Sequence, residues 1–128
     1  MKQAIAISPE IKPATTFSQK RIVVMDKHEC VFLNVEDIMF AEADGGYTRL
    51  HLNNGKCLLV SRNLKALSER LSPETFLRIH KSFIININTI SKYIKSEGGY
   101  VVLTNGKHIP VSVRKKELLL DLIEQLVL

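Results

Sequence analysis

The side chains best suited to chemistry in this sequence are four polar residues between two apolar stretches: Arg78, His80, Lys81 and Ser82. The stretches on either side alternate or run apolar, which is typical of β-strands. Cationic and hydrogen-bonding side chains at the junction of two strands are poorly suited to a core. They are well suited to an anion that also presents hydrogen-bonding edges, and double-stranded DNA has both features. The sequence therefore predicts an anion-binding turn at this junction.

A second group of cations begins the last segment of the chain, where Arg114, Lys115 and Lys116 follow Ser112. We expect a helix over residues 112–128, so these cations fall in its first turn. The helix dipole and the free N–H groups make that end electropositive, and each cation costs about 0.3–1 kcal/mol there. An external phosphate would offset this repulsion. The alternative is that the long side chains simply extend into water.

Arg62 and Lys65 repeat this arrangement at the start of a second helix, which we expect over residues 61–71 with Ser61 as its N-cap. A solvated helix face explains these two cations equally well. The sequence leaves both interpretations of this helix start open.

A tight turn at residues 44–46 (DGG) precedes a strand that begins with Tyr47, Thr48 and Arg49. Because neighbouring strand residues point to opposite faces, one of Thr48 and Arg49 should face outward. Arg49 could instead pair with Glu42 across the hairpin, a surface contact that stabilises little. We expect Tyr47 to pack rather than to stack on a base, and the small number of aromatic residues argues against single-strand binding.

Catalytic and metal-binding patterns are weak in this sequence. His80 and Ser82 could share one face of a strand, but no acid or oxyanion hole accompanies them, so we expect no enzyme and a structural, hydrogen-bonded His80. Cys30 and Cys57 lack CxxC spacing, and no two of the four histidines have the i,i+4 spacing of a helical metal site. We therefore expect reduced thiols, no metal site and no cofactor.

The chain has 128 residues, which is the size of one domain. No apolar run approaches the roughly 20 residues that span a bilayer, and the N-terminus lacks a signal-peptide pattern, so we expect a cytoplasmic protein with no membrane partner. The net charge of +5 is unevenly distributed: residues 26–44 contain six acidic residues and one basic residue, whereas residues 45–117 contain thirteen basic and four acidic residues. This polarity favours one face directed toward a polyanion, with a mixed solvated surface as the alternative.

The order of apolar segments and turns predicts a mainly β fold with one short internal helix and a C-terminal helix. Residues 1–19 read as a loosely ordered N-terminal tail, and residues 20–128 as the folded domain. Asn34 is a candidate cap for a short helical turn at 34–37. The expected strands are 21–25, 30–33, 38–43, 47–52, 56–60, 77–79, 83–87, 90–94, 100–103 and 108–111.

Several of these segments together resemble the LytTR-type DNA-binding domain of bacterial transcription regulators, over about residues 20–120. The motifs that carry the resemblance occur in the family's order, which is far more specific than one pattern match. They are residues 37–50 (DIMFAEADGGYTRL), 61–67 (SRNLKAL), 76–86 (FLRIHKSFIIN), 105–106 (NG) and 109–114 (IPVSVR).

The resemblance implies an elongated stack of small antiparallel sheets with about ten strands, and DNA recognition by loops that enter the major groove. It implies base contacts at three positions, which here are Thr48, Lys81 and Arg114. Arg114 could pair with a guanine through two hydrogen bonds, and Lys81 could reach a guanine or a phosphate. The remaining polar positions are expected to contact the DNA backbone. They are Arg49, Arg62, Arg78, His80, Ser82, Lys115 and Lys116.

The expected partner is double-stranded DNA, bound sequence-specifically by a transcriptional regulator, with two copies as a homodimer on two half-sites. Members of this family often carry a receiver domain or a membrane sensor segment, and 19 preceding residues cannot form a receiver. No small-molecule substrate is expected. The alternative function is a protein-interaction module that keeps the fold without binding DNA and uses the leucine-rich C-terminal helix for its partner.

Overall fold

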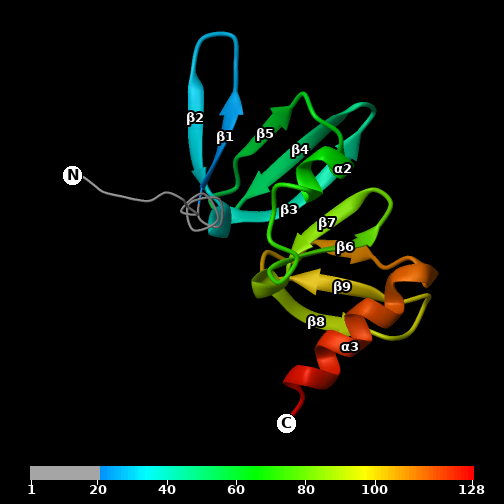
Figure 1. Ribbon diagram of the computed structural model, residues 1–128. Helices are drawn as coiled ribbons and strands as arrows, with labels where there is room; N and C mark the ends of the chain where they lie inside the picture. Colours follow the sequence, from blue (N-terminus) through cyan, green and yellow to red (C-terminus); the bar gives the residue numbers. More distant parts are fainter. Residues whose placement is uncertain (1–20) are drawn as a thin grey trace, which may run out of the picture.

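Residues 21–128 are described by a computed structural model and form ten β-strands and two α-helices (Figure 1). The strands make three antiparallel sheets, ordered β1-β2, β5-β4-β3-β7-β6 and β10-β9-β8. The predicted mainly β stack of small antiparallel sheets is confirmed. The strands are β1 (Arg21–Met25), β2 (Cys30–Asn34), β3 (Ile38–Asp44), β4 (Tyr47–Leu52), β5 (Cys57–Val60), β6 (Phe76–His80), β7 (Phe83–Asn86), β8 (Ile90–Ile94), β9 (Tyr100–Leu103) and β10 (His108–Pro110). The helices are α2 (Leu64–Ser68) and α3 (Lys116–Leu126), and the 3-10 turns are η2 (Val35–Asp37), η3 (Ile87–Thr89) and η4 (Val113–Lys115).

The five-stranded sheet separates two apolar cores, because successive side chains of a strand point to opposite faces. On β7, Ile84 joins the core shared with α2 and the β1–β2 hairpin, while Ile85 joins the core shared with α3. On β3, Ile38 and Phe40 also belong to different cores, since a bulge shifts the register between them. A strand whose two faces are both covered has a nearly continuous apolar sequence, and this explains the sequence of β7.

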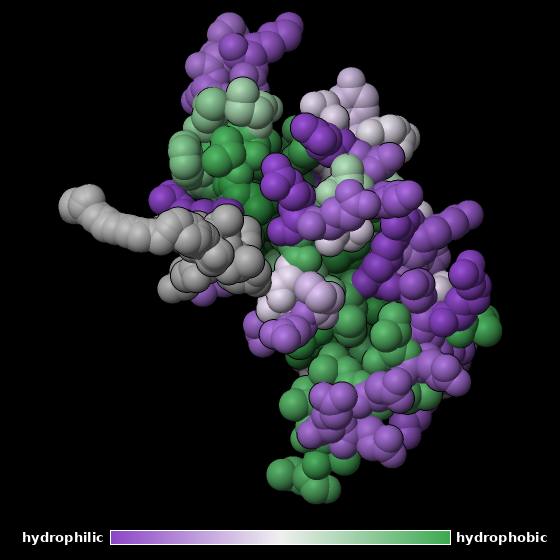
Figure 2. All heavy atoms as spheres, viewed as in Figure 1, coloured by the Kyte–Doolittle hydropathy of each residue, from purple (hydrophilic) through white to green (hydrophobic). Residues whose placement is uncertain are grey.

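The β1–β2 hairpin and α2 cover one face of this sheet (Figure 1). The hairpin contributes Val24 and Leu33 to the core, and α2 contributes Leu64 and Leu67. The outer face of the hairpin leaves apolar side chains in solvent. Figure 2 shows this as a green surface over the hairpin, bordered by purple hydrophilic residues. The exposed apolar residues of the hairpin are Val23, Met25 and Phe32.

The three-stranded sheet and α3 cover the other face. Val101 and Ile109 are fully buried there, and Leu119 inserts from α3. The amide of Ser112 donates to the carbonyl of Ile79 at 2.9 Å, so the start of the C-terminal segment is fixed to the end of β6. This bond sets the position of η4 relative to the central sheet.

Asn86 joins the central sheet to the segment that follows it. Its side chain is buried, and its Nδ2 donates to the carbonyl of Ile38 at 3.0 Å while its Oδ1 accepts from the amide of Asn88 at 2.9 Å. The hydroxyl of Thr89, also buried, donates to the carbonyl of Asn86 at 2.7 Å. A buried amide with these partners avoids an unpaired polar group.

The helix boundaries differ from the sequence-based predictions. The internal helix spans Leu64–Ser68 instead of 61–71, and its cap is Asn63, whose Oδ1 accepts from Ala66, so the prediction of Ser61 was wrong. Asn34 occupies the N-cap position of η2, but its side chain makes no capping hydrogen bond. The predicted C-terminal helix of 112–128 is divided into η4 and α3.

The predicted tail at residues 1–19 lies outside the described residues. Within residues 21–128, no helix is long and apolar enough to cross a membrane.

Candidate nucleic-acid interface

Three segments that are far apart in the sequence meet at one edge of the molecule: the β3–β4 turn, the β6–β7 turn and η4. The amide of Ala43 donates to the carbonyl of Ser82 at 2.9 Å, which ties the first two segments together. The bond from Ser112 to Ile79 ties η4 to the strand that precedes the second turn. In Figure 1 all three segments lie on the right side of the view. We call these three segments the loop edge.

The β6–β7 turn is held by its own polar side chains. The Arg78 guanidinium donates to the carbonyl of Lys81 at 2.7 Å, and the amide of Ser82 donates to Nδ1 of His80 at 3.1 Å. The His80 ring also packs against Phe83, with 5.7 Å between ring centroids. These contacts leave the exposed side chain of Lys81 directed away from a fixed turn. Such a turn limits the entropy that Lys81 loses when it binds a ligand.

His80 has the structural, hydrogen-bonded role that the sequence predicted. Because its Nδ1 accepts a backbone N–H, the ring proton of the neutral form lies on Nε2, where it can be donated to an anion. Ser82 takes part through its backbone amide, so His80 is not positioned as a base for the Ser82 hydroxyl in this arrangement. Within residues 21–128, no group of three His, Cys, Asp or Glu side chains is close enough to hold a metal ion.

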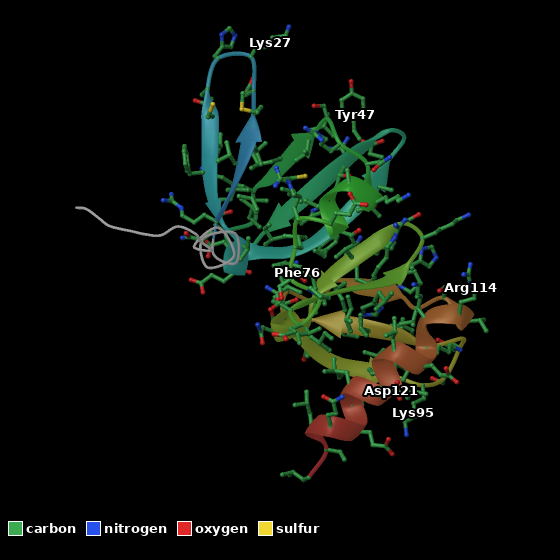
Figure 3. All side chains as sticks on the ribbon, in the orientation of Figure 1. Lys27, Tyr47, Phe76, Lys95, Arg114 and Asp121 are labelled. Atoms are coloured by element: carbon green, nitrogen blue, oxygen red, sulfur yellow. The ribbon has the colours of Figure 1, made fainter. Side chains whose placement is uncertain are left out.

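The η4 segment presents the second group of cations. Arg114 is exposed and lies at the right side of Figure 3, at the turn that precedes α3. Arg114 and Lys115 belong to η4, and Lys116 is the first residue of α3, so the prediction that all three cations fall in the first turn of the helix was wrong for Arg114 and Lys115. No side chain caps α3, and η4 runs directly into it: the amide of Lys115 donates to the carbonyl of Ser112 at 3.0 Å, and the amide of Lys116 donates to the carbonyl of Val113.

Thr48 does not present its side chain to solvent. It is fully buried, and its hydroxyl donates to the carbonyl of Arg62 at 2.7 Å. In this arrangement the Thr48 side chain cannot contact a DNA base, although the family resemblance implied such a contact. The hydroxyl instead holds the backbone at Arg62, since Thr48 pairs with Val60 in the register of β4 and β5. The backbone at Arg62 is thereby held against the start of β4, and the Arg62 side chain is exposed.

Arg49 is the outward-facing member of its pair with Thr48, as the alternation predicted. It forms an ion pair with Asp44 at 2.9 Å, not with Glu42, which instead contacts His51 at 3.0 Å. A hydrogen bond with the Cys57 side chain and the charge of Asp44 raise the pKa of Arg49 above its ordinary value. Both members of the Arg49–Asp44 pair are about half exposed, so the pair contributes little stability and leaves Arg49 free to exchange partners.

Tyr47 was expected to pack, but it is 51% exposed beside the Gly45–Gly46 turn (Figure 3). The sequence carried a signal for this, because Thr48, Leu50 and Leu52 alternate on one face and are all buried. Tyr47 therefore belongs to the opposite face of β4. The loop edge thus carries an exposed aromatic side chain, Tyr47, where the sequence had predicted a packed one.

The β8–β9 turn supports the loop edge, although no motif in the sequence pointed to it. The amide of Val111 donates to the carbonyl of Gly99 at 3.3 Å, and Gly99 has a φ of +90°. A Cβ at this glycine would lie 2.8 Å from Oη of Tyr93 and 3.2 Å from Cε of Lys116. Only glycine fits this position without displacing the side chains next to η4.

Comparison with known families agrees with this geometry. The sequence model of the LytTr DNA-binding domain family matches residues 28–124 of this chain. The chain belongs to the LytTr DNA-binding domain family. It is therefore a DNA-binding domain of the kind found in bacterial transcriptional regulators, and the resemblance read from the sequence motifs is confirmed.

Several curated relatives share this domain. The chain is 31% identical over 101 residues to the CO-responsive transcriptional regulator RcoM of Rhodospirillum rubrum, covering 77% of this chain and 42% of RcoM. It is 33% identical over 82 residues to the transcriptional regulatory protein NatR of Bacillus subtilis, covering 64% of this chain and 35% of NatR. The chain thus spans less than half the length of these relatives.

A solved LytTr DNA-binding domain from Bacillus cereus has the same fold. It superposes with a TM-score of 0.71 at 20% identity, and the match covers 82% of this chain and 97% of that domain. At this level of identity the likeness establishes the architecture of the sheets and not the DNA sequence that is read.

Proposed function

We propose that this chain binds double-stranded DNA sequence-specifically and regulates transcription, reading major grooves through the loop edge. The observation that carries the proposal is the pair of exposed cations, Lys81 and Arg114, on turns that backbone hydrogen bonds fix to the same sheet. An enzyme-like role has no comparable support, since the family is a DNA-binding one. A DNA-binding role also fits a cytoplasmic location.

Lys81 and Arg114 are proposed as the base readers. Arg114 has a planar group with several donors and is exposed, so it can form two hydrogen bonds to guanine O6 and N7. Lys81 extends from a turn whose backbone is already fixed, and it reads either a guanine or an adjacent phosphate. Thr48 is left out of the base-contacting set because its side chain is buried.

The remaining polar residues of the loop edge and its neighbourhood are proposed as phosphate contacts. A guanidinium has five donors, so Arg78 can keep its bond to the Lys81 carbonyl and still donate to a phosphate. Arg49 can exchange Asp44 for a phosphate, because their ion pair is exposed. These contacts set affinity and register without reading the sequence. The proposed set is Arg49, Arg62, Arg78, His80, Ser82, Lys115 and Lys116.

We also propose that two copies bind two half-sites as a homodimer. The observation that favours a protein contact is the exposed apolar surface of α3, which would be costly to leave in water. The same surface would serve a different protein partner if the chain has kept the fold without binding DNA. The exposed apolar residues are Leu118, Leu120 and Leu126 of α3, followed by Val127 and Leu128.

Selection from a library of random duplexes tests this function directly. The chain should enrich one sequence motif and bind it with a dissociation constant on the order of 10⁻⁸ M, with an affinity that falls steeply as salt rises. A site composed of two repeated half-sites would support the homodimer. Failure to enrich any motif, together with co-purification of a protein through α3, would favour the interaction-module alternative.

A further inference from the structure

A cavity of about 370 Å³ lies between the β1–β2 hairpin and the segment that joins β5 to α2. Its apolar lining includes the buried side chains of Val24, Leu50 and Leu67, together with the half-buried Val60 and Ala66. This volume is at the lower end of the range for small-molecule sites. The cavity lies on the opposite face of the central sheet from α3, so it belongs to a different part of the fold from the α3 surface.

Three arginines from three separate elements line the same cavity: Arg21 of β1, Arg62 before α2, and Arg70 after α2. All three are exposed, and none takes part in an ion pair with another residue of the described range 21–128, where the ion pairs are Arg49–Asp44 and His51–Glu42. Ser61 adds a hydroxyl to the lining. No aspartate or glutamate is among the residues that line the cavity.

The combination of an apolar interior with guanidinium groups that form no ion pair within residues 21–128 selects one class of ligand. Three like charges near one cavity raise its positive potential, and a carboxylate accepts paired hydrogen bonds from arginine. An apolar chain or ring on the same molecule would occupy the space over Leu50 and Leu67. A cation of the same shape would be repelled, and a purely polar anion would leave the apolar lining in water.

We propose that this cavity binds a small amphipathic carboxylate, with its apolar part inside and its carboxylate held by Arg62 and Arg70. Arg21 is partly engaged elsewhere, since its guanidinium lies 5.2 Å from the centroid of the Phe32 ring. Arg62 is shared with the DNA contacts proposed above, so a bound carboxylate would compete with a phosphate for this side chain. That consequence, unlike the binding itself, rests on the proposed function.

Titration of the full chain with three probes of equal chain length tests the binding: octanoate, octylammonium and 1-octanol. We expect octanoate to bind about tenfold or more tightly than octylammonium, with 1-octanol between them. Isothermal titration calorimetry at low salt measures the affinities, and backbone amide shifts locate the site. Octanoate binding that is absent, equal to octylammonium binding, or located away from the cavity overturns the proposal.

Arg70→Gln and Lys65→Gln form a matched pair of variants. Each removes one exposed cation near α2, but only Arg70 lines the cavity. Arg70→Gln should weaken octanoate binding about tenfold, whereas Lys65→Gln should change it less than twofold. If both variants weakened octanoate binding equally, the binding would depend on general surface charge and not on the cavity, and the proposed site would be wrong. Occupation of the cavity by the chain's own residues 1–20 would block octanoate in the full chain, and that outcome also overturns the proposal.

The link to DNA is measured separately, by repeating the duplex titration with octanoate present. Competition at Arg62 should weaken DNA binding in the wild type and much less in Arg70→Gln. If octanoate binds but leaves DNA affinity unchanged, the cavity stands as a ligand site, and the assignment of Arg62 as a shared contact fails.

Discussion

Replacing Arg114 in two ways separates base reading from simple charge attraction. Arg114→Ala removes the charge and the paired donors, while Arg114→Lys keeps the charge and removes the planar fork. Because the Arg114 side chain is exposed and belongs to no ion pair within the described residues, neither change should alter the free energy of unfolding by more than about 0.5 kcal/mol. Any change in DNA binding therefore reports on the interface itself.

The expected magnitudes follow from the two kinds of contact. A guanine pair with two hydrogen bonds is worth about 1–3 kcal/mol of discrimination, or roughly 5- to 150-fold between the best site and a single-base variant. Both substitutions should remove this discrimination at one base pair. Arg114→Ala should also lower the slope of log affinity against log salt by about 0.9, whereas Arg114→Lys should leave that slope nearly unchanged.

Fluorescence anisotropy titrations with the selected duplex and its single-base variants, at several salt concentrations, measure both quantities. Lys56→Ala is the control, because Lys56 is an exposed cation at the β4–β5 turn, at the end of β4 away from the loop edge. The reasoning is refuted if Arg114→Lys keeps full selectivity. That result would make Arg114 a phosphate contact, and Arg114→Ala would then weaken all sequences equally.

Three further substitutions test the way the fold supports the loop edge. Thr48→Val should lower the free energy of unfolding by about 1 kcal/mol in urea denaturation, because it removes the buried hydrogen bond to the Arg62 carbonyl. The same substitution should leave base selectivity unchanged. A loss of selectivity at one base pair would restore Thr48 as a base-reading residue. Asn86→Ala should lower the free energy of unfolding by about 1–3 kcal/mol, because it leaves buried backbone groups unpaired. A change of less than about 0.5 kcal/mol, which is typical of surface substitutions, would contradict the structural role of Asn86. Gly99→Ala should destabilise the chain more than Gly106→Ala. Both glycines have φ near +90°, but only at Gly99 would the added methyl group contact Tyr93. Equal losses of stability in thermal denaturation would show that the Tyr93 contact is unimportant.

The sequence predicted the strands well because alternation and turn residues act locally. The paired strands on either side of Gly45–Gly46 and the strand around Ile84 and Ile85 follow from patterns that any neighbouring structure must respect. The burial of Thr48 was also present in the pattern, since it lies two residues before Leu50 on the same face. The family resemblance outweighed that local signal and assigned Thr48 to the DNA.

Helix ends were harder to predict, because several residues can serve as caps and tertiary contacts choose among them. Ser61 and Asn63 are both good caps, but Thr48 binds the carbonyl of Arg62 and β5 continues to Val60, so the helix begins only after Asn63. The C-terminal helix starts late for a similar reason, since Ser112 is fixed to β6 by its own amide.

Local sequence patterns alone could not predict that the residues of the candidate site lie close together in space. Lys81 and Arg114 are separated by more than thirty residues, and their approach depends on the bonds from Ala43 to Ser82 and from Ser112 to Ile79. Such contacts reflect the order of strands in the sheet. The family resemblance supplied the positions of the loops, and the structure gives the strand order that brings them together.

The most direct test of the loop edge is a backbone amide NMR titration of the full chain with the selected duplex. The largest shifts should fall in the β3–β4 turn, the β6–β7 turn and η4, with the β4–β5 turn and the tip of the hairpin near Lys27 unchanged (Figure 3). Shifts concentrated on the hairpin or on the exposed face of α3, with the turns around Lys81 and Arg114 unaffected, would contradict the account.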